Sequence, residues 1–184
     1  MLKAVFTRIL ASVLLPLMIL LIPAGSASTS AAVPAAEQQA APGADFEALL
    51  NLNYCYGTSF SDEAIAMGTL FSLLELAGEE DGFRYLETEQ ADYFTQAFYG
   101  RTVDFAACGL EVSGGRVWIP AMGYDLYTHT LISAEENGEQ VKVLSKVVCD
   151  GHDGVTFDAL CTSVFVKNTE SPFGYHLLSS EILD

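Results

Sequence analysis

Apolar residues recur at helical spacing in three segments of the first half of the chain. A short stripe follows Asp45, a residue type that caps helix N-termini. A longer segment begins after Ser61, carries acids in its first turn and ends before Gly78, which we expect to adopt a left-handed conformation. A third runs from about residue 89 to 99 and ends at Gly100. The pattern predicts three amphipathic helices that need a common surface to cover.

Beta-branched and aromatic residues dominate from Leu110 onward, and turn signals recur at strand-length spacing. The turns are Gly114-Gly115, Asn137-Gly138, residues 150–154 and residues 171–174. They predict a meander of about five antiparallel strands. The order of the predicted elements, with helices before strands, indicates an α+β fold. We expect about three N-terminal helices packed on one face of a curved antiparallel sheet of about five strands.

The Asn137-Gly138 pair, read as a two-residue turn, fixes a register for the hairpin around it. Paired residue numbers then sum to 275, which places His129 opposite Lys146. Alternation along the strand puts Tyr127, His129 and Leu131 on one face of the sheet.

The first 27 residues have the pattern of a signal peptide. Lys3 and Arg8 precede an apolar run over residues 9–22, and residues 23–27 are small, with cleavage expected after Ala27. The run of about 14 residues is shorter than the roughly 20 that a membrane-spanning helix needs, which disfavours the alternative of a retained anchor. We therefore expect a secreted or extracytoplasmic protein without stable membrane insertion after cleavage.

Residues 28–44 are rich in Ala, Ser, Pro and Gln and hold Val33 as their one larger apolar residue. Such a segment buries too little surface to offset the entropy of ordering it, so we expect a disordered linker. Residues 45–184 have the composition and length of a single α+β domain.

The chain is strongly acidic. Loss of residues 1–27 removes two of the eight basic residues and none of the 24 acidic ones, which leaves a formal charge of −18. This charge repels phosphate backbones and excludes nucleic acid as a partner. The partner predicted is an unidentified protein or small-molecule ligand.

Histidine and cysteine offer little chemistry. Asp125 lies four residues before His129, about 13 Å along a strand, too far to orient the imidazole. His152 lies in a glycine-flanked turn, and His176 lies in a predicted strand. The sequence thus identifies no catalytic, cofactor-binding or metal-ligating residue.

The four cysteines lack CxxC and zinc-binding spacings, and export favours disulfides over buried thiols. Two registers are open for the hairpin around residues 150–154, with Cys149 opposite either Asp158 or Val155. Neither brings Cys149 within bonding distance of Cys161. Full oxidation would therefore join Cys55 and Cys108 to the sheet.

Seven aromatic residues fit two interpretations: they pack in the core, or they line a pocket between the helices and the sheet. Core packing is the favoured interpretation. The residues concerned are Phe71, Tyr93, Phe94, Phe98, Trp118, Tyr124 and Tyr127. An enzyme using such a pocket needs a buried acid, for which Asp104, Asp125 and Asp158 are the candidates.

The order of elements, together with the ending Phe165-Val166-Lys167-Asn168 and residues 171–179, resembles small exported bacterial domains of the nuclear-transport-factor-two-like and cystatin-like superfolds. These superfolds include enzymes, inhibitors and binding modules. We expect a non-enzymatic binding or accessory domain. The alternatives are a small-pocket lyase or isomerase, and a cystatin-like protease inhibitor that projects the Gly114-Gly115 hairpin.

Overall fold

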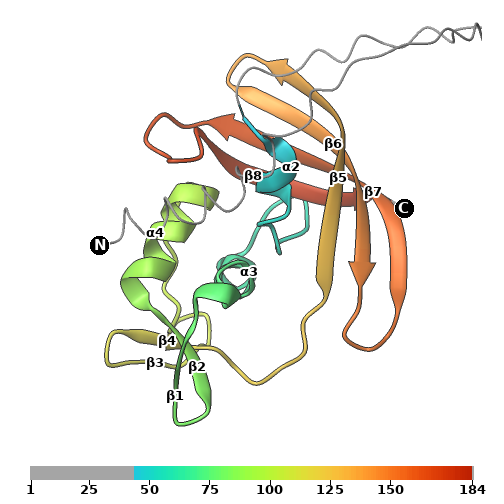
Figure 1. Cartoon of the computed structure of the whole chain (residues 1–184). Coiled ribbons are helices and arrows are strands. Elements are labelled where there is room, and N and C mark those ends of the chain that lie inside the picture. The colour runs from blue at the N-terminus through green and yellow to red at the C-terminus, as the bar shows by residue number, and fades with distance from the viewer. Residues whose placement is uncertain (1–43, 184) are drawn as a thin grey trace, which may run out of the picture. The chain divides into compact units, whose positions relative to one another are not determined.

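The computed structural model describes residues 44–183; the predicted signal peptide, residues 28–43 of the predicted linker and residue 184 lie outside them. Helices α2 (Phe46–Leu50), α3 (Asp62–Ser72) and α4 (Thr88–Tyr99) and the short 3-10 helix η2 (Leu74–Leu76) are joined to two antiparallel sheets (Figure 1). The strands are β1 (Gly78–Glu80), β2 (Phe83–Glu87), β3 (Val112–Ser113), β4 (Arg116–Trp118), β5 (Leu126–Asn137), β6 (Gln140–Asp150), β7 (Thr156–Lys167) and β8 (Tyr175–Leu183). The α+β class is confirmed.

The sheet prediction needs correction, because the described residues form two four-stranded sheets instead of one of five strands. The small sheet has the order β1-β2-β4-β3 and the large sheet β5-β6-β7-β8. The first hairpin, β1–β2, was missed because Gly78-Glu79-Glu80 has low β propensity. Its pairing depends on a turn at Asp81 and Gly82, both with positive φ, and on the contact of β2 with β4.

Helix starts follow the expected local signals. The carboxylate of Asp45 accepts a hydrogen bond from the N–H of Ala48, and the Ser61 hydroxyl accepts one from Ala64. Gly100 ends α4 in the left-handed conformation, with φ of 73°.

Two helix predictions are wrong. Gly78 does not end a helix; α3 ends at Ser72, and Gly78 begins β1. The helices also do not all precede the strands, since α4 follows β1 and β2 in the chain. Helix α4 contacts β8 of the large sheet as well as β2 and β4 of the small sheet, so it joins the two sheets.

The β5–β6 hairpin turns one residue later than predicted. Asn137 pairs with Gln140, which makes Gly138 and Glu139 the turn residues. Gly138 alone of the two has positive φ, as a type II′ turn requires at its first central position. A bulge between Leu131 and Ser133 then shifts the register again. His129 therefore lies opposite Val147 instead of Lys146.

Strands β6 and β7 pair with Cys149 opposite Phe157, so both registers considered for this hairpin are wrong. Cys161 lies opposite Ser145, and the inference that Cys149 and Cys161 do not bond is confirmed. The expected disulfides are absent, because all four cysteines are free thiols. Cys55, Cys149 and Cys161 are buried, where a thiol packs as a small apolar side chain.

The core lies between the helices and one face of the large sheet, with α2 against β5 and α4 against β8 (Figure 1). Its largest fully buried apolar side chains include Phe46, Ile65, Leu70, Phe94, Phe98 and Phe165. In residues 44–183 no helix has the length and apolar character needed to cross a membrane.

Candidate functional site

The three histidines lie in separate places. His129 is in the core on β5, His152 is in the loop between β6 and β7, and His176 is on β8. Asp125 binds His152, with 2.8 Å between Oδ1 and Nδ1, and also accepts a hydrogen bond from the backbone N–H of His152. These hydrogen bonds hold the pKa of Asp125 below its usual value. Sequence spacing missed this pair because a loop brings together residues 27 positions apart.

His129 is held at both ring nitrogens. Its Nε2 lies 2.9 Å from the Tyr56 hydroxyl, and its Nδ1 lies 2.9 Å from the Ser145 hydroxyl. The side chain is 1% exposed. Burial lowers the pKa of His129 to about 4, so the imidazole is neutral at pH 7, with one nitrogen donating and the other accepting.

A line of small polar side chains continues from Ser145 across the buried face of the large sheet. Cys161 pairs with Ser145 in register, and its sulfur lies 3.3 Å from the Ser180 hydroxyl. Ser163 and Ser180 are 2.8 Å apart. Cys161, Ser163 and Ser180 are fully buried and bonded to one another, which is the pattern of a structural polar network.

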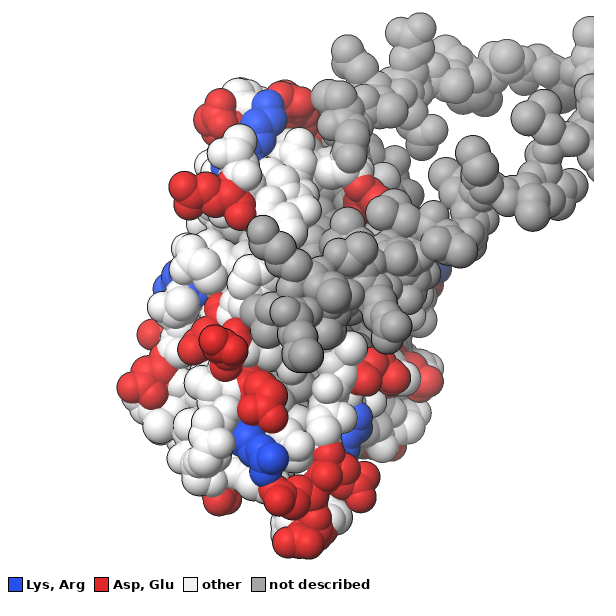
Figure 2. Space-filling model, turned by 60° about the vertical axis from the view of Figure 1, so that its left-hand side comes forward, with Lys and Arg blue, Asp and Glu red and all other residues white. Residues whose placement is uncertain are grey.

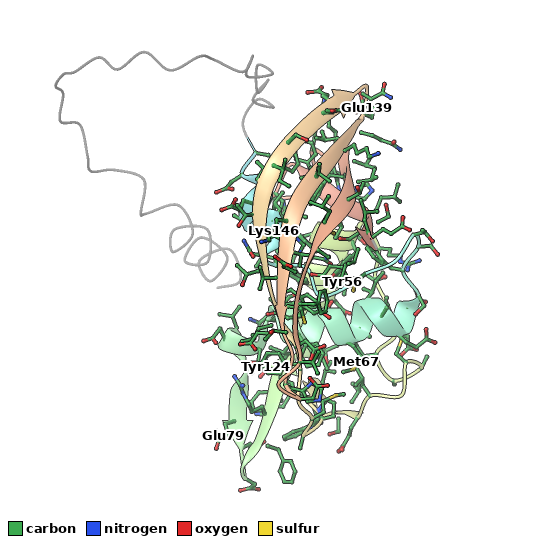
Figure 3. All side chains as sticks on the ribbon, turned by 90° about the vertical axis from the view of Figure 1, so that its right-hand side faces the viewer. Tyr56, Met67, Glu79, Tyr124, Glu139 and Lys146 are labelled. Carbon is green, nitrogen blue, oxygen red and sulfur yellow. The ribbon has the colours of Figure 1, made fainter. Side chains whose placement is uncertain are left out.

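The partly exposed candidate site is a row of five aromatic rings, which we call the aromatic row: Tyr54, Tyr56, Phe71, Tyr124 and Tyr127. Centroid distances are 4.6 Å from Tyr56 to Tyr127, 6.2 Å from Tyr127 to Tyr54, 6.0 Å from Tyr54 to Phe71, and 5.1 Å from Phe71 to Tyr124. The rings come from the segment before Gly57, from α3, from the loop that precedes β5 and from β5 itself. Figure 3 labels Tyr56, which lies beside α3, and Tyr124.

Carboxylates lie around the aromatic row. The Tyr127 hydroxyl donates to Asp125 at 3.5 Å. Burial, with smaller contributions from Cys149 and Asp125, raises the pKa of Tyr127 to about 12. Burial also raises the pKa of Tyr54, and Tyr124 and Glu75 add to the effect. The phenols of Tyr54 and Tyr127 are therefore neutral hydrogen-bonding groups beside negative charge, an arrangement suited to stacking on neutral or cationic groups.

The aromatic residues that the sequence offered for a core or a pocket separate into several clusters. Phe71, Tyr124 and Tyr127 belong to the aromatic row, whereas Phe94 and Phe98 stack on each other in the core. Trp118 contacts Tyr85, whose ring lies 4.0 Å from the Arg116 guanidinium.

Sequence reasoning missed Tyr54 and Tyr56 in the aromatic row. Their alternating spacing before Gly57, which forms an isolated β-bridge with Ser180, was the available signal.

None of the three acids proposed for a pocket is buried. Asp104 caps its own turn by accepting hydrogen bonds from Ala106 and Ala107. Asp158 pairs with Lys146 at 2.6 Å, and Asp125 pairs with His152. Across residues 44–183 the buried polar side chains are those of Asn, Ser, Thr and His, with no carboxylate among them.

In the described part of the chain no group of three or more His, Cys, Asp or Glu side chains is arranged to hold a metal ion. Comparison of the chain with family models, curated proteins and solved structures gives no match. The proposed function therefore depends on the geometry of the site alone.

Proposed function

We propose that the chain is an exported acidic domain with a non-enzymatic binding role, and that the aromatic row contacts its ligand. The observation that carries this proposal is the row itself, five partly exposed rings in mutual contact beside Asp125 and Glu75. Partly exposed tyrosines supply rigid contact area and hydrogen-bonding hydroxyls at low entropic cost. The surrounding carboxylates favour a neutral or cationic ligand over an anionic one.

The buried histidine supports binding over catalysis. A general base must reach a substrate proton, and both nitrogens of His129 are bonded inside the core. The isomerase alternative also requires a buried acid, and Asp104, Asp125 and Asp158 each have a surface partner or cap a turn.

The inhibitor alternative depends on a hairpin that projects into a protease. The carbonyl of Gly115, at the β3–β4 turn, accepts a hydrogen bond from the N–H of Thr88, the first residue of α4. Strand β4 also lies between β2 and β3 in the small sheet. This anchoring favours the binding role over the inhibitor role.

The test is a titration of the chain from Ser28 followed by the NMR signals of its aromatic rings. The probes are tetramethylammonium, cellobiose as a neutral sugar, and phosphate as the anionic control. We expect tetramethylammonium or cellobiose to shift the NMR signals of the aromatic row. Tyr124→Ala should abolish the shift, and Phe83→Ala, which removes an aromatic ring outside the row, should leave it unchanged.

Two results would overturn the proposal. One is the absence of any shift with either probe at millimolar concentration, and the other is a shift that Tyr124→Ala leaves intact. A response to phosphate alone would contradict the expected preference of the site.

A further inference from the structure

The large sheet has a face turned away from the helices, which we call the outer face. Alternate residues of β5 to β8 point to it, and four large apolar side chains there are exposed: Leu126 (49%), Val148 (43%), Leu160 (45%) and Leu183 (39%). Leu160 pairs directly with Leu183, and Val148 is a diagonal neighbour of Leu160. Figure 1 shows α3 and α4 together on the other side of this sheet.

The outer face is less acidic than the rest of the described residues: it carries two of their six basic side chains, Lys142 and Lys146, against four acids, Glu135, Asp150, Asp158 and Glu181. Lys146 pairs with Asp158 at 2.6 Å, and Lys142 lies opposite Glu135 in register. Figure 2 shows acidic side chains in clear excess over basic ones on the side of the molecule that carries α4. Two copies of such an acidic chain repel each other, and the repulsion is weaker between the outer faces, where lysines offset half of the acidic charge.

The outer face also has the size of a stable interface. Strands of 9 to 12 residues rising about 3.3 Å per residue, spaced about 4.8 Å apart, give four strands an area of roughly 600 to 700 Å². A standard protein interface buries about 800 Å² per partner. Sheets rich in Thr, Val and Leu pack face to face at about 10 Å in β-sandwiches.

We propose that the outer face binds the same face of a second copy of this chain, forming a two-fold symmetric dimer with Leu160 near its centre. A two-fold interface places the same surface on both partners, so it must be self-complementary, and a face that carries exposed Leu and Val together with charges of both signs meets this requirement.

The test is sedimentation velocity of the chain from Ser28 between about 1 and 200 μM. We expect a concentration-dependent dimer that Leu160→Lys weakens by about tenfold or more. Leu160→Thr, which keeps β propensity, should weaken it less. Phe83→Thr is the matched control, because Phe83 is 63% exposed on the β1–β2 hairpin, and it should leave the dimer unchanged. Raising the salt concentration should tighten the dimer by screening the net charge.

The proposal fails if the chain from Ser28 is monomeric at the highest concentration. It also fails if the Leu160→Lys and Leu160→Thr variants dimerise as tightly as the wild type. The wild-type circular dichroism spectrum in both variants shows that they are folded. A dimer that forms only after residues 28–44 are deleted would assign the outer face to that segment instead. The aromatic row lies on other residues, so its titration is an independent measurement.

Discussion

The side-chain amide of Asn51 binds the backbone of His129 in the way that a neighbouring strand would. Its oxygen accepts the N–H of His129 at 2.8 Å, and its nitrogen donates to the carbonyl of His129 at 3.3 Å. Two residues along, a Glu47 carboxylate oxygen accepts the N–H of Leu131 at 2.7 Å. Because β5 is an edge strand of the large sheet, these side chains close part of an edge that would otherwise offer free hydrogen-bonding groups.

Replacing Asn51 by Ala should destabilise the fold by about 1 to 3 kcal/mol, because the backbone N–H and C=O of His129 lose their partner beside the core. The free energy of unfolding from urea titration measures this loss. Glu47→Gln is the matched control, since the amide oxygen still accepts from Leu131, and a change below about 0.5 kcal/mol is expected. Equal stability of Asn51→Ala and the wild type would show that water replaces the amide at no cost.

The buried imidazole makes stability depend on pH. His129 has a pKa of about 4 in the folded chain, whereas an unfolded histidine titrates near 6.5. Between these values the unfolded chain binds the proton and the folded chain does not. The free energy of unfolding should therefore fall as the pH drops from about 6.5 to about 4, by about 2 to 3 kcal/mol for this group. Above pH 6.5, where His129 is neutral in both states, none of this stability is lost.

His129→Gln isolates that contribution, because it removes the titrating ring while the carboxylates titrate as before. The quantity to compare is the difference in free energy of unfolding between pH 7.5 and pH 4.5 in each protein. This difference should be smaller in the variant by about 2 to 3 kcal/mol, whatever its absolute stability. Identical differences would mean that the folded protein holds His129 with an ordinary pKa.

Gly68 lies in α3 where a side chain has no room. An added Cβ would be 2.5 Å from the sulfur of Cys55 and 3.3 Å from the hydroxyl of Tyr99. Gly68→Ala should therefore lower the free energy of unfolding by about 1 to 2 kcal/mol, although alanine favours helices by up to about 1 kcal/mol over glycine.

Cys55→Ala removes the atom that the new methyl group meets. The double variant should therefore be more stable than the two single losses predict, with a coupling of at least about 0.5 kcal/mol. Additive losses would place the strain elsewhere. Urea titration of the four proteins of this cycle gives the answer.

The thiols should differ in reactivity in the native protein. Cys108 is partly exposed, while the other three are buried, and burial raises the pKa of Cys55 to about 11. A thiol reagent should modify Cys108 first and all four cysteines after denaturation. Reductant should leave the melting temperature unchanged, and Cys108→Ser should abolish the fast reaction. Fewer than four thiols in the denatured, unreduced protein would reveal a disulfide.

Local signals were readable from the sequence because their partners lie within a few residues. Asp45 and Ser61 cap residues three positions later, and Gly100 needs only its own backbone freedom. The turn at Gly114-Gly115 follows for the same reason, since both glycines have positive φ. Export, which the first 27 residues predict, lies outside the described residues and stays a prediction.

The second sheet and the site were decided by contacts between distant segments. The Tyr56–His129 hydrogen bond joins residues 73 positions apart, and the Asp125–His152 pair needs a loop to fold back. One bulge and a turn shifted by one residue changed every pairing of β5, because register depends on local turn geometry that several sequences satisfy. The sequence predicted the three helices and the strands of the large sheet, whereas only the packed structure determined the β1–β2 hairpin and which faces meet, since packing energy depends on neighbours in space.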